Sequence, residues 1–177
     1  KSFRSLIETL GAMGVGHQFV DEYLLEKYGY VEGDALVMGE KKYHCVVLPD
    51  MAGLDGYTAE LLDEYVMNGG KIWLQGKCPD YVDGEKVELG YQSNISVDDL
   101  LNPACLISDR TTEIRSTLRR WKEGDFLYAV NLSKDKTYSV NYRIKAQGVS
   151  RFDLETGEKR PLFFQKEGEY VNLPLTF

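Results

Sequence analysis

The stretch from residue 43 to residue 79 constrains the fold more than any other part of the chain. It reads YHCVVLPDMAGLDGYTAELLDEYVMNGGKIWLQGKCP. Residues 44–48 and 71–74 are apolar runs without alternation, which is typical of strands buried on both faces of a parallel sheet. Between them, Asp55 can cap an amphipathic helix, and the Asn-Gly-Gly sequence at 68–70 can end it. The stretch therefore predicts a right-handed βαβ crossover and a parallel sheet.

A candidate site follows from this crossover. In doubly wound sheets, ligands bind beyond the carboxyl ends of the strands. Asp50 follows the first strand, and Gln75 and Cys78 follow the second. These three residues are the candidate site of the first half of the chain. The alternative is that they are ordinary loop residues, because a position in a fold does not by itself carry a function.

The rest of the first half alternates between helix and strand patterns. Apolar residues spaced i, i+3, i+4 and i+7 predict a helix from Ser2 to Met13. Residues 15–20 and 35–38 predict strands, and residues 23–28 predict a helical turn. Ser96, followed three residues later by Asp99, predicts a short capped helix that ends at Pro103.

The second half changes to the period of strands. Residues 118–122 and 126–132 predict a hairpin with a turn at 123–125, and residues 138–144 alternate between apolar and polar side chains. Three more strands are predicted at 149–154, 161–165 and 170–175. Short strands separated by turns every roughly 8–12 residues predict a β-sandwich.

We therefore expect an α/β domain over residues 1–95 and an all-β sandwich over residues 96–177. The chain begins at Lys1, already within a helix pattern, and ends at Phe177 in a strand-rich region. We expect both domains to be truncated at these ends.

Composition excludes several classes of function. The 21 basic and 28 acidic residues give a formal net charge of −7, which argues against nucleic acid and favours neutral or cationic partners. No apolar run reaches about eighteen residues, so no membrane span is predicted. The three cysteines show neither metal spacing nor a CxxC motif, and no metal or other cofactor is predicted. Their odd number leaves at least one free thiol, which favours a reducing or cysteine-indifferent compartment.

Two patterns together carry a resemblance to a known family. Residues 43–79 resemble the glutamine-amidotransferase-like, flavodoxin-like α/β domain of large bacterial glycoside hydrolases, such as the trimerisation domain of some β-galactosidases and the corresponding domain of rhamnosidase-type enzymes. LRRWKEGDFLYAVNLS at 118–133 and FDLETGEKRPL at 152–162 look like the β-sandwich that follows such domains. The two patterns extend from residue 43 to residue 162 of the 177-residue chain.

The resemblance implies a fold and a role. The fold would be a flavodoxin-like, amidotransferase-like parallel sheet followed by an all-β sandwich. The role would be that of a non-catalytic accessory region in carbohydrate metabolism, which supports the catalytic domain of the parent chain or its homo-oligomerisation. The parent enzyme would be periplasmic or extracellular.

Two alternatives remain open at this point. Trp121 and Tyr128 in the second half could stack on sugar rings, because aromatic side chains offer flat apolar faces with polar edges. In that case the region would be a carbohydrate-binding module. Alternating strands place about half of their aromatic side chains inside, so burial is the competing interpretation.

The other alternative is a cysteine-dependent, amidotransferase-like enzyme with Cys78 as nucleophile. Such an enzyme needs a histidine and a carboxylate beside the cysteine. Pro79 follows Cys78 and lacks the backbone N–H that an oxyanion hole would use. The only histidines, His17 and His44, lie early in the chain, whereas the catalytic histidine of the family comes late. The sequence therefore predicts no catalytic residue.

Overall fold

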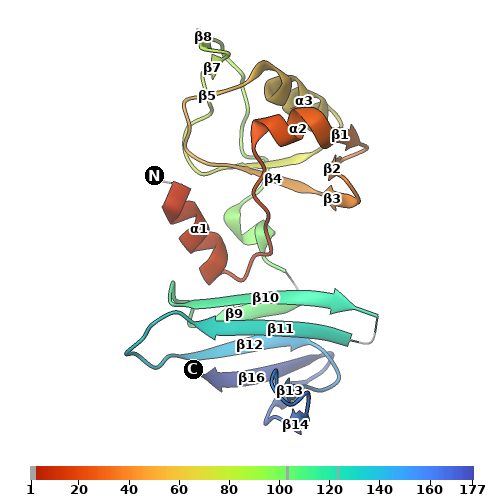
Figure 1. Ribbon diagram of the computed structural model, residues 1–177, viewed down its shortest axis with the longest axis vertical. Coiled ribbons are helices and arrows are strands. Elements are labelled where there is room, and N and C mark those ends of the chain that lie inside the picture. The colour runs from red at the N-terminus through yellow and green to blue at the C-terminus, as the bar shows by residue number, and fades with distance from the viewer. Residues whose placement is uncertain (1–2, 103, 123) are drawn as a thin grey trace. The chain divides into compact units, whose positions relative to one another are not determined.

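The computed structural model describes residues 3–102, 104–122 and 124–177 (Figure 1). The chain divides into two compact units, one formed by Lys1–Ile7 and His17–Leu100 and the other by Glu8–Gly16 and Leu101–Phe177. Three sequence predictions involve Ser2, Pro103 and Glu123, which lie outside the described residues. The first helix, α1, runs over Phe3–Ala12 and contributes residues to both units.

The first unit contains an antiparallel meander of three short strands. The strands are β1 (Gly29–Glu32), β2 (Ala35–Met38) and β3 (Lys41–Tyr43), and β2 pairs with both of the others. The helix α2 (Glu22–Tyr28) precedes them, and its first turn is capped by Asp21. The predicted strand at 15–20 is wrong. That segment pairs with no strand of the described chain, and its residues from His17 to Val20 are exposed.

The βαβ prediction is confirmed at the level of its three elements. The strand β4 (Cys45–Leu48) pairs in parallel with β6 (Lys71–Leu74), and α3 (Gly56–Met67) connects them. Asp55 caps α3, with its Oδ1 accepting a hydrogen bond from the Thr58 N–H at 2.6 Å. At the other end, Gly69 adopts a φ of +87°, which glycine reaches without a steric penalty.

The predicted fold class, a flavodoxin-like parallel sheet followed by an all-β sandwich, is wrong. The parallel sheet stops at two strands, β4 and β6. A second group pairs β5 (Gly53–Leu54) with β7 (Tyr81–Val82) in parallel and β7 with β8 (Glu85–Lys86) antiparallel, over two residues each. The other sheets are small and antiparallel. An apolar run of four residues fits a two-stranded ribbon as well as the centre of a larger sheet, so the run does not reveal how many strands flank it.

The core of the first unit lies between α3 and these strands. Its buried members include Leu61, Leu62 and Tyr65 of α3, Leu48 of β4 and Ile72 of β6. After β8 the chain continues to a single 3-10 turn, η1 (Val97–Leu100). Asp99 Oδ2 accepts hydrogen bonds from both the N–H and the hydroxyl of Ser96 in front of this turn.

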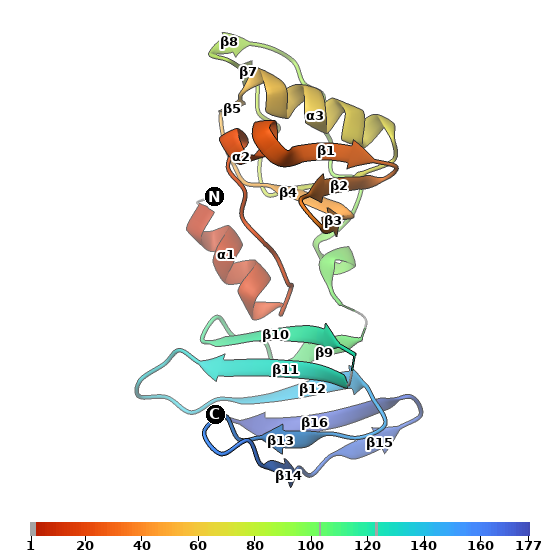
Figure 2. The same ribbon diagram turned by 45° about the vertical axis from the view of Figure 1, so that its right-hand side comes forward.

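The strands of the second unit form antiparallel sheets (Figure 2). Its largest sheet has four strands in the order β15-β16-β12-β9, and two hairpins accompany it. The sheet strands are β9 (Cys105–Ser108), β12 (Ser139–Lys145), β15 (Gln165–Glu167) and β16 (Tyr170–Thr176), and the hairpins are β10 (Ile114–Trp121) with β11 (Gly124–Asn131) and β13 (Ser150–Phe152) with β14 (Lys159–Pro161).

The alternation predicted for residues 138–144 is confirmed, because Val140, Tyr142 and Ile144 are buried and Ser139 and Asn141 are exposed. The strand predicted at 161–165 is wrong. Its central residues form the connection from β14 to β15.

The hairpin β10–β11 packs one face on the four-stranded sheet. Leu118, Leu127 and Ala129 contact a buried cluster that includes Tyr142 and Val171 of that sheet. The opposite face of the hairpin, called the outer face below, points away from this core because side chains alternate along each strand.

Candidate functional site

The carboxyl ends of β4 and β6 bring Asp50 close to the loop that follows β6. Gln75 N donates to Leu48 O at 2.9 Å, and Lys77 N donates to Asp50 Oδ1 at 3.4 Å. A Cβ atom added to Gly76 would lie 2.5 Å from Asp50 Oδ1, so the loop passes directly over this carboxylate. Asp50 therefore anchors the loop.

Gln75 and Cys78 also make structural contacts. The Gln75 side chain donates from Nε2 to the Ser5 hydroxyl at 3.0 Å, which ties the loop to the first turn of α1. Its Oε1 is buried and has no partner among the described residues. Cys78 is half-buried and packs against the apolar core of the first unit, and Pro79 beside it is fully buried. The structure thus places the three candidate residues at one end of the sheet, as expected from the crossover.

The histidines do not complete a cysteine site there. His44 directly precedes β4, whereas Cys78 follows the carboxyl end of β6, which is parallel to β4. Four strand residues at about 3.3 Å each separate these two ends of the sheet by more than 10 Å. His17 is exposed and packs edge-to-face on Phe19, with ring centroids 5.2 Å apart.

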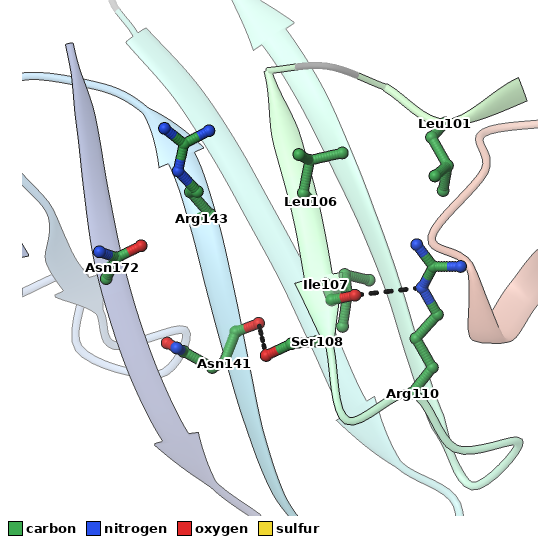
Figure 3. A pocket seen from close by; sticks show the side chains of 8 residues that line it. All are labelled: Leu101, Leu106, Ile107, Ser108, Arg110, Asn141, Arg143 and Asn172. Atoms are coloured by element: carbon green, nitrogen blue, oxygen red, sulfur yellow. Dashed lines mark hydrogen bonds between the residues drawn. The ribbon is translucent and has the colours of Figure 1, made fainter. Parts of the chain in front are cut away.

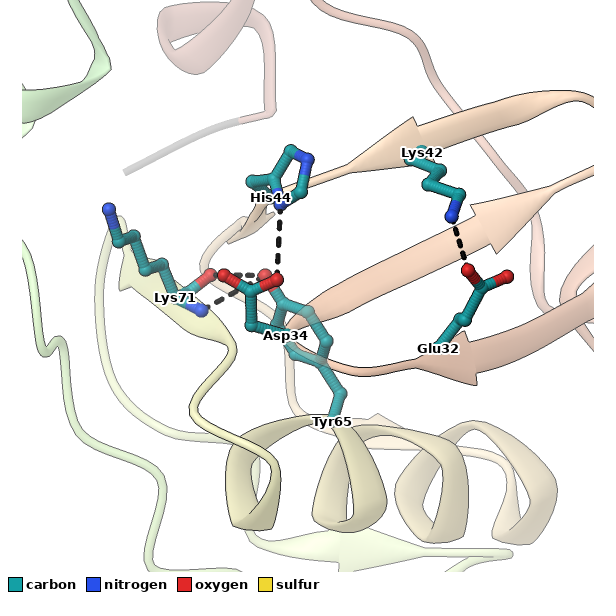
Figure 4. Close-up of polar contacts among 6 residues, drawn as sticks. All are labelled: Glu32, Asp34, Lys42, His44, Tyr65 and Lys71. Atoms are coloured by element: carbon teal, nitrogen blue, oxygen red, sulfur yellow. Dashed lines mark hydrogen bonds and ion pairs between the residues drawn. The ribbon is translucent and has the colours of Figure 1, made fainter.

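The contacts around His44 are structural as well (Figure 4). Its Nδ1 lies 3.5 Å from Asp34 Oδ1, and both side chains are exposed. Nearby, the Tyr65 hydroxyl accepts a hydrogen bond from Lys71 N at 2.9 Å and donates to Lys71 O at 3.1 Å. Burial raises the pKa of Tyr65 to about 12, partly offset by the Lys71 backbone N–H. Tyr65 therefore stays protonated at neutral pH and fixes the start of β6.

The other two candidates, Trp121 and Tyr128, lie on the outer face of the hairpin β10–β11. Trp121 pairs with Gly124, Arg119 with Phe126, and Thr117 with Tyr128. Residues that pair directly in an antiparallel ladder share a face, as do residues two apart along a strand. Trp121, Phe126 and Tyr128 consequently point the same way, and they are 70%, 50% and 53% exposed. We call these three side chains the aromatic strip.

Neighbouring groups delimit the aromatic strip. Phe152 of β13 meets Phe126 edge-to-face, with ring centroids 6.3 Å apart. Further along β10, Arg115 Nη1 donates to Glu8 O at 3.3 Å, so helix residues of the second unit cover that end of the outer face. Phe126 was missed as a site residue in the sequence, although its spacing of two from Tyr128 on one strand would have indicated it.

Metal sites and membrane spans are absent from the described residues. No group of three or more His, Cys, Asp or Glu side chains there is placed to hold a metal ion. None of the described helices combines the length and apolarity that crossing a membrane requires. No protein-family model matches the chain, and no curated protein matches it.

Proposed function

We propose that the chain is a non-catalytic accessory region of a glycoside hydrolase and that the aromatic strip is its glycan-contacting surface. The observation that carries the proposal is that Trp121, Phe126 and Tyr128 share one exposed face of a hairpin whose other face is fixed in the core. The glycoside hydrolase part of the proposal rests on the resemblance of residues 43–79, 118–133 and 152–162.

The physical basis is the match between an aromatic ring and the apolar C–H face of a sugar. Exposing three large aromatic rings to water is unfavourable, and clusters of this kind commonly mark binding sites. The hairpin holds the strip rigidly, because Leu118 and Leu127 on its inner face are packed against the sheet. A pre-organised surface loses little conformational freedom on binding, which favours affinity.

The positions around Asp50, Gln75 and Cys78 favour the non-catalytic part of the proposal. Asp50 is used to hold the loop at Gly76, and Cys78 packs against core side chains at the end of the sheet opposite His44. A nucleophilic cysteine would need a base within hydrogen-bond reach. Within this proposal the first unit has a supporting role, toward the catalytic domain of the parent chain or toward oligomerisation.

The test is binding of neutral oligosaccharides by the 177-residue chain, measured by affinity electrophoresis and calorimetry. A panel of galacto-, gluco- and rhamno-oligosaccharides would be used. Trp121→Ala and Tyr128→Ala should each weaken binding by about tenfold, equivalent to 1.4 kcal/mol. Tyr23→Ala is the matched control, because Tyr23 is similarly exposed, at 66%, but lies on α2. Absence of binding to every member of the panel, or equal effects of the three variants, would refute the glycan-contacting role.

A further inference from the structure

A pocket of about 400 Å³ lies on the face of the four-stranded sheet that points away from the core (Figure 3). It belongs entirely to the second unit and shares no residue with the aromatic strip. Its volume is within the range of small-molecule sites. The lining residues combine two cations, two amides, a hydroxyl and three aliphatic residues: Arg110, Arg143, Asn141, Asn172, Ser108, Leu101, Leu106 and Ile107.

The register of the sheet arranges these groups in rows. Leu106, Arg143 and Asn172 pair across β9, β12 and β16, and Ser108 and Asn141 form the next row. Adjacent strands are about 4.8 Å apart, so the row of three residues spans roughly 10 Å and the row of two roughly 5 Å, the width of one sugar ring. The rows therefore offer an aliphatic surface at Leu106 beside amide and guanidinium groups.

Arg143 is fixed in place and its charge is compensated. Its guanidinium lies over the Tyr170 ring, 3.8 Å from the centroid, and its Nε is 3.6 Å from Glu167 Oε2. Asn172 donates from Nδ2 to the same carboxylate oxygen at 3.0 Å. This hydrogen bond from Asn172, and the charge of Arg143, lower the pKa of Glu167. Arg143 and Asn172 thus form a rigid, nearly neutral group of hydrogen-bonding side chains.

Arg110 at the other side of the pocket is different. Its Nε donates to the backbone carbonyl of Ile107 at 3.1 Å, and it forms no ion pair with any carboxylate of the described residues. The carboxylate of Asp109, the acid next to Arg110 in the sequence, accepts a hydrogen bond from the Ser108 hydroxyl at 3.3 Å. A guanidinium whose Nη groups remain for a ligand is a good partner for a carboxylate, which it can bind through two parallel hydrogen bonds.

We propose that this pocket binds a hydroxylated carboxylate of monosaccharide size, the chemistry of a hexuronic acid. The carboxylate pairs with Arg110, the hydroxyl groups bond to Asn141, Asn172 and Arg143, and a C–H face of the ring lies on Leu106. This inference does not depend on the proposed function, because a different sheet and different side chains carry it.

The first experiment maps binding on the intact chain by ¹⁵N–¹H NMR. Glucuronate and galacturonate are titrated separately, with glucose as the uncharged control and acetate as the carboxylate without hydroxyls. We expect either uronate to shift the amides of Leu106, Ser108 and Asn172, and glucose and acetate to cause shifts only at concentrations at least tenfold higher. Shifts outside the pocket, equal responses to glucose and uronate, or no shift with either uronate would overturn the proposal.

Variants separate recognition of the ligand's carboxylate from recognition of its hydroxyl groups. Arg110→Met should weaken uronate binding at least tenfold and leave the weak glucose response unchanged, whereas Asn141→Ala should weaken both. Arg160→Met is the matched control, since Arg160 is an exposed arginine of β14 outside the pocket, paired with Glu158. If Arg110→Met alters folding, the effect of 0.5 M NaCl on the unmodified chain gives the same information, because screening should weaken uronate binding severalfold and not glucose binding. Uronate binding that is unaffected by Arg110→Met or by salt would overturn the role of the arginine.

Discussion

The hydroxyl of Tyr65 should contribute measurably to the stability of the first unit. The Tyr65 side chain is fully buried, and its hydroxyl bonds both the N–H and the C=O of Lys71 at the start of β6. Tyr65→Phe removes both hydrogen bonds and keeps the ring. The ring packs against Gly70, where an added Cβ would lie 2.5 Å from ring atoms, and this contact is kept in Tyr65→Phe.

The expected loss follows from the number of bonds removed. Each hydrogen bond contributes a net ~0.5–1.5 kcal/mol, and an unsatisfied buried group can cost more. Water can reach Lys71 in part, because that residue is exposed in β6. We therefore expect Tyr65→Phe to lower the free energy of unfolding by about 2 kcal/mol.

Urea unfolding followed by the fluorescence of Trp73 measures this loss. Trp73 lies on β6 in the first unit, and Trp121 of the second unit is replaced by Phe in all proteins compared. Tyr23→Phe is the control for removal of an exposed hydroxyl, with an expected change within about 0.5 kcal/mol. If Tyr65→Phe changed stability no more than this control, the two hydrogen bonds would not hold the junction of α3 and β6 as argued.

Three further predictions concern pH, thiol reactivity and capping. Folding raises the pKa of Tyr65 from 10.0 to about 12, so Tyr65 ionises at a lower pH in the unfolded chain than in the folded chain. The contribution of Tyr65 to the free energy of unfolding should therefore be complete below pH 10 and lost as the pH rises to about 12. In urea unfolding, the difference in stability between the unmodified chain and Tyr65→Phe should be smaller at the higher pH. Burial raises the pKa of Cys45 and of Cys105 to about 11, so mass spectrometry should find both thiols alkylated slowly by iodoacetamide at neutral pH and quickly once urea unfolds the chain. Asp55→Ala should lower stability by about 1 kcal/mol in urea unfolding because it removes the cap on Thr58 N, and Asp55→Asn should retain most of that contribution.

Local signals in the sequence were sufficient to predict single helices and strands but insufficient to predict how the strands pair into sheets. The helix α3 was predicted correctly because its cap at Asp55 and its end at Asn68 depend on neighbouring residues only. The direction and number of neighbouring strands depend on distant residues. Gly53 and Leu54 pair with a two-residue strand at 81–82, and no periodicity can be read from so short a segment. The predicted parallel sheet failed for this reason.

The candidate site likewise combines features that neighbouring residues determine with features that distant residues determine. The position of Asp50 and Gln75 at one end of the sheet followed from the order of strand, helix and strand. Whether the Asp50 side chain faces a ligand or a loop is decided by its contact with residue 76, and only the absence of a side chain at Gly76 indicates that contact. The Gln75 side chain bonds to Ser5, which is distant in the sequence. The Arg110 pocket was not predicted, because its rows come from three strands whose register the sequence does not specify.

The aromatic strip depends on the register of its hairpin. A three-residue turn at 123–125, as predicted, would pair Lys122 with Phe126 and would set Trp121 opposite Leu127. Trp121 and Tyr128 would then lie on opposite faces, since a register shift by an odd number of residues, here three, reverses the side chains of one strand relative to the other. The observed register pairs Trp121 with Gly124 and puts both rings on the outer face. The hairpin register is thus the structural feature on which the proposed glycan contact depends.

A net charge of −7 does not conflict with a carboxylate-binding pocket. Charges in water interact over about 8 Å at physiological ionic strength, so a ligand of monosaccharide size responds to the nearest side chains and not to the whole surface. At the pocket, Glu167 is already engaged by Arg143 and Asn172, and Arg110 has no acidic partner among the described residues. The composition argues against long polyanions such as nucleic acid, which need many cations along one surface. A net negative charge is compatible with the binding of one carboxylate at one arginine.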